Sequence, residues 1–157
     1  MNQNIRDLIL KNDRLIELNT LIKLGVIKME DAVAEVIAMG NASRIYAFAR
    51  DIEGAPIVKL ADAMIATYNE SYIYELAVYM QDKELLNEEL KVKFARAIIK
   101  TKSAQFICLY ARDIKNAPLK ELTEAEIAIG DAEYLYLYAR NVDVVPTGLT
   151  EREAATK

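Results

Sequence analysis

The chain contains a copy of itself sixty-two residues further on, and this duplication limits its fold more than any other feature. When residues 42–80 are laid over residues 104–142 without a gap, fifteen of the thirty-nine positions are identical. Each copy divides again into two similar halves. Periods of about 20 to 50 residues are typical of repeat proteins, in which each unit buries its apolar face by packing on its neighbours.

The repeated segments carry apolar side chains at helical spacing. Positions i, i+3, i+4 and i+7 are apolar four times over, which places them on one stripe of an amphipathic helix. The residue at i+4 is always alanine, and we expect so small a side chain to let a neighbouring helix approach closely. The four sets are Ile45, Phe48, Ala49 and Ile52; Ile73, Leu76, Ala77 and Met80; Ile107, Tyr110, Ala111 and Ile114; and Leu135, Tyr138, Ala139 and Val142.

A second helix is predicted after each stripe but the last, and the turns between the helices are marked by special residues. Pro56 and Pro118 begin two of these helices, since proline is tolerated in a first turn. Gly54 and Asn116 stand two residues earlier, where a positive φ closes the preceding helix. Residues 81–86 replace this turn in the third pair. The predicted second helices span residues 56–68, 87–101 and 118–129, with an earlier relative at 28–39.

These patterns predict an all-α fold, a short right-handed α-solenoid of about four to five antiparallel helix pairs. We expect one domain over residues 1–145, with a flexible C-terminal tail at 146–157. Residues 4–40 form a diverged N-terminal repeat, because the outer face of a terminal repeat meets water. The duplicated units are residues 42–80 and 104–142.

Composition favours a protein partner. With 24 acidic and 20 basic residues the formal charge is −4, so the chain lacks the broad cationic surface that neutralises phosphates. Nucleic acid is therefore disfavoured. One cysteine, no secretory signal pattern and no apolar run of about 20 residues predict a soluble, cytoplasmic chain without a membrane segment.

The residues that usually carry catalysis are scarce, and we expect neither enzymatic activity nor a cofactor or metal. The chain has no histidine, which removes the commonest general base and imidazole ligand. Glycine-rich phosphate loops and calcium-loop motifs are also missing. Cys108 has Arg112 one helical turn away, which can lower a thiol pKa, but a passive thiol is favoured without a base.

Other polar residues have structural interpretations. Ser43, Ser71 and Ser103 stand at or near the starts of first helices, where a hydroxyl commonly caps backbone N–H groups; an exposed linker role is the alternative. Three glutamates close together in sequence are interpreted as members of solvated helix faces, not as a catalytic pair. They are Glu121, Glu124 and Glu126.

One constellation points to binding. Three tyrosines share one repeat position, and arginines recur four residues after that position, one turn away on the same face. In a solenoid these residues would form a row of tyrosine and arginine, both of which are enriched in binding hot spots. The alternative is structural: the tyrosines pack between helices, and the arginines pair with neighbouring acids. The candidate binding residues are Tyr46, Arg50, Tyr74, Arg112, Tyr136 and Arg140.

The phrase Tyr46-Ala47-Phe48-Ala49-Arg50-Asp51-Ile52-Glu53-Gly54-Ala55-Pro56, with its partial echo at residues 134–142, resembles a loose family of roughly 30-residue helical repeats. The resemblance covers about residues 12–142. That family occurs in uncharacterised proteins of bacteriophages and of low-GC Gram-positive bacteria. The resemblance implies a HEAT-like solenoid and a phage or other mobile element as source, and it departs in residues 81–89, where the Gly-Ala-Pro turn is lost.

The predicted function is a non-catalytic protein-binding module. The resemblance narrows it to a phage inhibitor of a host defence or regulatory protein, the class to which anti-CRISPR proteins belong, acting in the host cytoplasm. The alternative is a nucleic-acid-binding repeat, with bases stacked on the tyrosines and phosphates held by the arginines. Homo-oligomerisation stays open, because Leu85 and Leu86 in the inserted segment can be buried by a second copy as well as by their own chain.

Overall fold

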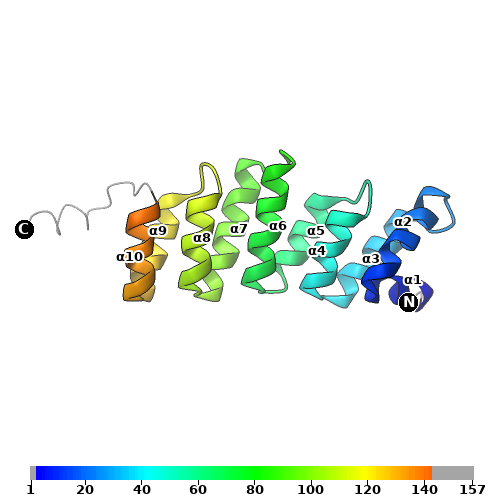
Figure 1. Cartoon of the computed structure of the whole chain (residues 1–157), viewed down its shortest axis with the longest axis horizontal. Coiled ribbons are helices and arrows are strands. Elements are labelled where there is room, and N and C mark those ends of the chain that lie inside the picture. The colour runs from blue at the N-terminus through cyan, green and yellow to red at the C-terminus, as the bar shows by residue number, and fades with distance from the viewer. Residues whose placement is uncertain (1–2, 143–157) are drawn as a thin grey trace, which may run out of the picture. The chain divides into compact units, whose positions relative to one another are not determined.

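The structure, a computed structural model, describes residues 3–142, and every regular element in this range is a helix (Figure 1). The prediction of an all-α fold is thereby confirmed for these residues. The chain divides into two compact units, residues 1–79 and 80–157, which are described one at a time. The single domain predicted over 1–145 stays a prediction, and the tail predicted at 146–157 lies outside the described residues.

The first unit is built around α4, which packs against α1, α2, α3 and α5. Its core holds the fully buried side chains of Ile9, Leu18, Ile45, Phe48 and Leu60. A helix that the repeat pattern did not predict, α1, closes the N-terminal side of this core. The elements are α1 (Gln3–Leu10), the 3-10 turn η1 (Asn12–Arg14), α2 (Leu15–Lys23), α3 (Met29–Met39), α4 (Ala42–Asp51), α5 (Ile57–Ile65) and α6 (Glu70–Asp82), which crosses into the second unit after Tyr79.

The second unit is built around α8, which packs against α7, α9 and α10. Phe94, Ile98, Ile107 and Tyr110 are fully buried there. The Tyr110 hydroxyl donates to the backbone oxygen of Lys91 at 2.7 Å, so the one polar atom of this core ring has a partner. The remaining elements are α7 (Glu88–Thr101), α8 (Ala104–Asp113), α9 (Leu119–Ile129) and α10 (Ala132–Asn141).

The predicted apolar stripes of α4, α6 and α8 are buried throughout, including the alanines Ala49, Ala77 and Ala111. The fourth stripe differs. Ala139 on α10 is exposed and Leu135 is only partly buried. The expectation of close packing at every repeat alanine is therefore wrong for Ala139, because α10 is the last described helix and no described helix covers that side of it.

Side chains cap the starts of the first helices, and at two of these starts the capping residue is not the predicted serine. Ser103 caps α8 by accepting from the backbone N–H of Phe106 at 3.5 Å. Ser43 and Ser71 lie inside the first turns of α4 and α6, and the asparagine two residues earlier caps instead. The cap at α4 accepts from the Arg44 N–H at 3.2 Å, and the cap at α6 accepts from the Tyr72 N–H at 3.1 Å; these residues are Asn41 and Asn69.

The turns after the first helices have the predicted conformation. Gly54 and Asn116 have φ values of 75° and 54°, the left-handed region that suits these two residue types. In the inserted segment Glu84 takes this role, with φ of 58°, and the N–H of Leu85 donates back to the carbonyl of Met80 at 2.8 Å. The insertion therefore closes α6 with a Schellman-like turn.

Candidate binding surface

The helix α4 brings two of the predicted binding residues into direct contact. Tyr46 and Arg50 stand four residues apart and so share one face of the helix. The guanidinium carbon of Arg50 lies 5.5 Å from the centre of the Tyr46 ring, a cation–π distance. Tyr46 is partly buried, whereas the Arg50 side chain is 49% exposed. The ring is thus held by its surroundings while the cation faces solvent.

Two tyrosines of α6 complete this group. The Tyr72 ring centre lies 5.9 Å from that of Tyr46, with the planes at 47°. Tyr79 approaches Tyr46 edge-on at 6.5 Å and 80°. Both centre-to-centre distances are in the contact range of aromatic pairs, and the Tyr79–Tyr46 pair has the edge-to-face geometry that such pairs prefer. We call Tyr46, Arg50, Tyr72 and Tyr79 the aromatic cluster; all four belong to the first unit.

The charge of Arg50 is compensated by its neighbour in sequence. Its Nε and Nη2 atoms donate to the two carboxylate oxygens of Asp51, each at 2.7 Å. These hydrogen bonds raise the pKa of Arg50 above its ordinary value. Asp51 occupies two of the five N–H donors of the guanidinium. The cluster therefore offers aromatic area and a fixed guanidinium plane with little net charge.

The structure places the other predicted residues separately. Tyr74 lies on α6 and is partly buried. Arg112 on α8 repeats the arrangement of Arg50, because its Nε and Nη2 donate to Asp113 at 2.6 and 2.8 Å. In the second copy Cys108 occupies the position that Tyr46 has in the first. Arg112 therefore has no tyrosine one helical turn before it in the sequence.

The last two predicted residues lie on α10. Tyr136 is 64% exposed, and Arg140 is exposed as well. The exposed fraction of each tyrosine bears on the choice between binding and packing. Tyr136 faces solvent, whereas Tyr46 is partly buried and only part of its side chain faces solvent. Because the two units are described one at a time, a continuous row of tyrosine and arginine along the whole chain stays a prediction.

Sequence reasoning missed Tyr79 as a member of the aromatic cluster. A signal was present: Tyr79 follows Tyr72 by seven residues, which places both on one face of α6. The repeat alignment hid it, because the equivalent position in the second copy is Asn141.

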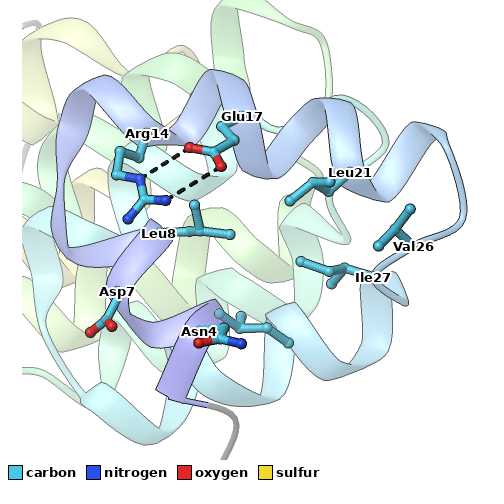
Figure 2. Close-up of a pocket in the computed structure, with 9 residues that line it drawn as sticks. Asn4, Asp7, Leu8, Arg14, Glu17, Leu21, Val26 and Ile27 are labelled. Atoms are coloured by element: carbon cyan, nitrogen blue, oxygen red, sulfur yellow. Dashed lines mark hydrogen bonds and ion pairs between the residues drawn. The ribbon is translucent and has the colours of Figure 1, made fainter.

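The first unit also contains a pocket of about 430 Å³ (Figure 2). In Figure 2 the Arg14–Glu17 pair lies at one end with Leu8 below it, and Leu21, Val26 and Ile27 lie at the other end. The polar side chains of Asn4 and Asp7 and the buried Ile5 complete the lining. This volume falls in the range typical of small-ligand sites.

Cys108 and Glu126 of the second unit are both buried. Burial raises the pKa of the Cys108 thiol, and the charge of Glu126 adds to this, whereas Arg112 lowers it less strongly. Glu126 is fully buried, so its predicted place on a solvated helix face is wrong: in the repeat it occupies the core position of Met64. Its pKa rises to about 7, first through burial and then through the charge of Asp131.

Within residues 3–142, no group of three or more cysteine and acidic side chains is placed to hold a metal ion. None of the helices in this range is both long and apolar enough to cross a bilayer. Comparison with known proteins finds no matching protein-family model, no matching curated protein and no matching solved structure.

Proposed function

We propose that this chain is a non-catalytic protein-binding module, a short HEAT-like α-solenoid that contacts its partner through the aromatic cluster. The observation that carries the proposal is the stacking of the exposed Arg50 on Tyr46, which is flanked by Tyr72 and Tyr79. Tyrosine and arginine are enriched in binding hot spots, because they add large amphipathic area to a contact. A preformed cluster also loses little side-chain entropy on association.

The solenoid part of the proposal is supported by the likeness of the two units. The pairs α4–α5 and α8–α9 each join a first helix to a second through a positive-φ residue and a proline two residues later. The stripe residues at equivalent positions, such as Ile45 and Ile107, are fully buried in both. Repetition of one unit with one buried face is the structural principle of a solenoid.

A protein partner is favoured over nucleic acid by the charge around the cluster. Asp51 holds the Arg50 guanidinium in two hydrogen bonds, so a phosphate would have to compete with a carboxylate already in place. Arg112 is held by Asp113 in the same way. A formal charge of −4 for the whole chain acts in the same direction.

The partner class rests on the resemblance to phage repeat proteins. It points to a host defence or regulatory protein, which the module would inhibit by covering a functional surface in the manner of an anti-CRISPR protein. Such a role needs a folded surface and no catalytic group.

The test is a pull-down from lysate of a Gram-positive host, using the full chain and the variants Tyr46→Ala and Arg50→Ala. The wild-type chain is expected to retain a defined protein, and each variant is expected to retain at least tenfold less. Arg112→Ala is the matched control, because it removes a similarly exposed arginine that also donates to the aspartate after it but has Cys108, not a tyrosine, four residues earlier in the chain. Equal recovery with all variants would remove the cluster from the interface.

A gel shift with single-stranded and duplex DNA at two salt concentrations accompanies this test. The proposal predicts no complex at physiological salt. A complex that weakens steeply as salt rises would assign the chain to the nucleic-acid-binding class instead.

A further inference from the structure

The pocket in the first unit differs from the aromatic cluster in both position and chemistry. It lies among α1, η1, α2 and the turn between α2 and α3, whereas the cluster lies on α4 and α6. Five of its nine lining residues are aliphatic. They are Ile5, Leu8, Leu21, Val26 and Ile27.

The polar lining of the pocket carries an excess of negative charge. Arg14 is its one basic residue, and its Nε and Nη2 donate to the Glu17 carboxylate at 3.0 and 3.3 Å. Asp7 adds a second carboxylate, whose Oδ1 accepts from the neutral amide of Gln3 at 3.0 Å. The negative charge of Asp7 also acts on Arg14 and, after the hydrogen bond and charge of Glu17, helps to raise the pKa of this guanidinium. The lining thus holds two carboxylates and one guanidinium, and its charge is −1.

Exposed apolar side chains are concentrated around this part of the chain. The largest exposures are those of Ile16, Leu24 and Val26, at 77%, 71% and 69%. Leu10 is 45% exposed. All four lie within residues 10–26, the segment that runs from the last residue of α1 through η1 and α2 to the following turn. Val26 belongs to the pocket lining itself, so the apolar surface continues from the pocket to the outside.

We infer that this pocket binds a peptide segment of a partner protein in which an aliphatic side chain stands next to a lysine or arginine. The aliphatic side chain enters between Leu8, Leu21 and Ile27, and the cation pairs with Asp7 at the edge of the pocket. Charge complementarity selects the basic neighbour, because an acidic one would meet Asp7 and Glu17. The exposed face of Val26 contacts the peptide beyond the inserted side chain. This site does not depend on the aromatic cluster.

The experiment titrates three peptides of equal length into the full chain and follows the methyl NMR signals of Leu8, Leu21, Val26 and Ile27. The first peptide carries adjacent leucine and lysine residues in a glycine–serine background. The second has glutamate in place of each lysine, and the third has serine in place of each leucine. The first is expected to shift all four signals at submillimolar concentration, and the other two are expected to bind at least tenfold more weakly.

Variants locate the site. Val26→Ser removes apolar contact at an exposed position and is expected to weaken the leucine–lysine peptide about three- to tenfold. Val58→Ser is the matched control, because this valine of α5 is 57% exposed and lies outside the pocket. Asp7→Asn is expected to weaken binding of the leucine–lysine peptide at low salt. Binding of the glutamate peptide to this variant is expected to be unchanged or slightly stronger.

Three outcomes would overturn the inference. One is equal binding of the lysine and glutamate peptides, and another is an unchanged affinity in Val26→Ser. The third outcome comes from two free amphiphiles, octylammonium and octanoate, that are titrated in the same way. If octylammonium shifts the four methyl signals and no peptide does, the ligand is a small aliphatic amine and not a peptide.

Discussion

Arg50 is held by two neighbours at once: its guanidinium carbon lies 5.5 Å from the centre of the Tyr46 ring, and its Nε and Nη2 donate to Asp51 at 2.7 Å. The carboxylate fixes the plane of the guanidinium, and the ring supports one side of it. Arg112 has the carboxylate partner but has Cys108 where Arg50 has Tyr46. The two arginines therefore share an aspartate partner and differ in the residue that stands one helical turn earlier.

Arg50→Ala is expected to lower the unfolding free energy by less than about 1 kcal/mol, because a half-exposed ion pair and cation–π contact contribute little to stability. Arg112→Ala is expected to cost no more. Urea denaturation of both variants measures these changes. A large loss in Arg50→Ala alone would show that the cluster serves folding, which would weaken its assignment to binding.

Glu126 predicts an unusual dependence of stability on pH. Neither of its side-chain oxygens has a hydrogen-bond partner among the described residues. The titratable groups whose charges interact with it are Cys108 on α8, Tyr138 on α10 and Asp131, the N-cap of α10, and none of them is a cation. Burial in such surroundings favours the protonated carboxyl.

The folded chain keeps this proton to about pH 7, whereas an unfolded chain releases it near pH 4.5. The unfolded state therefore binds fewer protons in this window, and the unfolding free energy falls as pH rises through it. The contribution is about 3 kcal/mol, from about 1.4 kcal/mol for each pH unit. Denaturation curves of the wild-type chain and Glu126→Gln from pH 4.5 to 8 measure it as their difference.

Two further variants complete this prediction. Glu124→Gln changes an exposed glutamate of the same helix and is expected to follow the wild-type curve. Glu126→Met installs the residue of the equivalent position, Met64, and is expected to be more stable than wild type at pH 7. Curves of wild type and Glu126→Gln that stay parallel over the whole range would contradict a buried, protonated carboxyl.

The buried hydroxyl of Tyr110 is expected to stabilise the second unit. Tyr110→Phe removes its 2.7 Å hydrogen bond to the Lys91 oxygen and restores the ring type that Phe48 has in the first unit. We expect a loss of about 1 kcal/mol in unfolding free energy. Tyr136→Phe, at a 64% exposed tyrosine, is the control and is expected to change nothing measurable. Thermal denaturation of both variants measures these changes. An unchanged stability in Tyr110→Phe would show that the hydrogen bond of the Tyr110 hydroxyl does not stabilise the fold.

Capping residues give a prediction that separates neighbouring positions. Asn41→Ala removes the acceptor for the Arg44 N–H and is expected to cost about 1 kcal/mol. Ser43→Ala, two residues later and inside the helix, is expected to cost nothing or to stabilise slightly, since alanine is the better helix former. Denaturation of both variants measures these losses. A larger loss of stability in Ser43→Ala than in Asn41→Ala would show that Ser43, and not Asn41, caps the helix.

Much of the fold follows from the sequence alone. The stripe from Ile45 to Ile52 predicts α4, and its copy from Ile107 to Ile114 predicts α8, because helical spacing is a local property that needs no knowledge of neighbours. The positive φ at Gly54 and Asn116 also follows from local sequence, because glycine and asparagine tolerate this conformation at the end of a helix. The contact of Tyr46 with Arg50 was also within reach, since four residues make one helical turn.

Tertiary structure alone decided which side chains are buried at positions where the sequence looks alike. Glu124 and Glu126 stand two residues apart in one acidic segment, yet the second faces the core because α8 and α10 enclose that side of α9. Ala139 matches Ala111 in sequence but is exposed, because no described helix follows α10. Periodicity fixes the face on which a residue lies, whereas burial depends on what packs against that face, and this is settled only when segments distant in sequence come together.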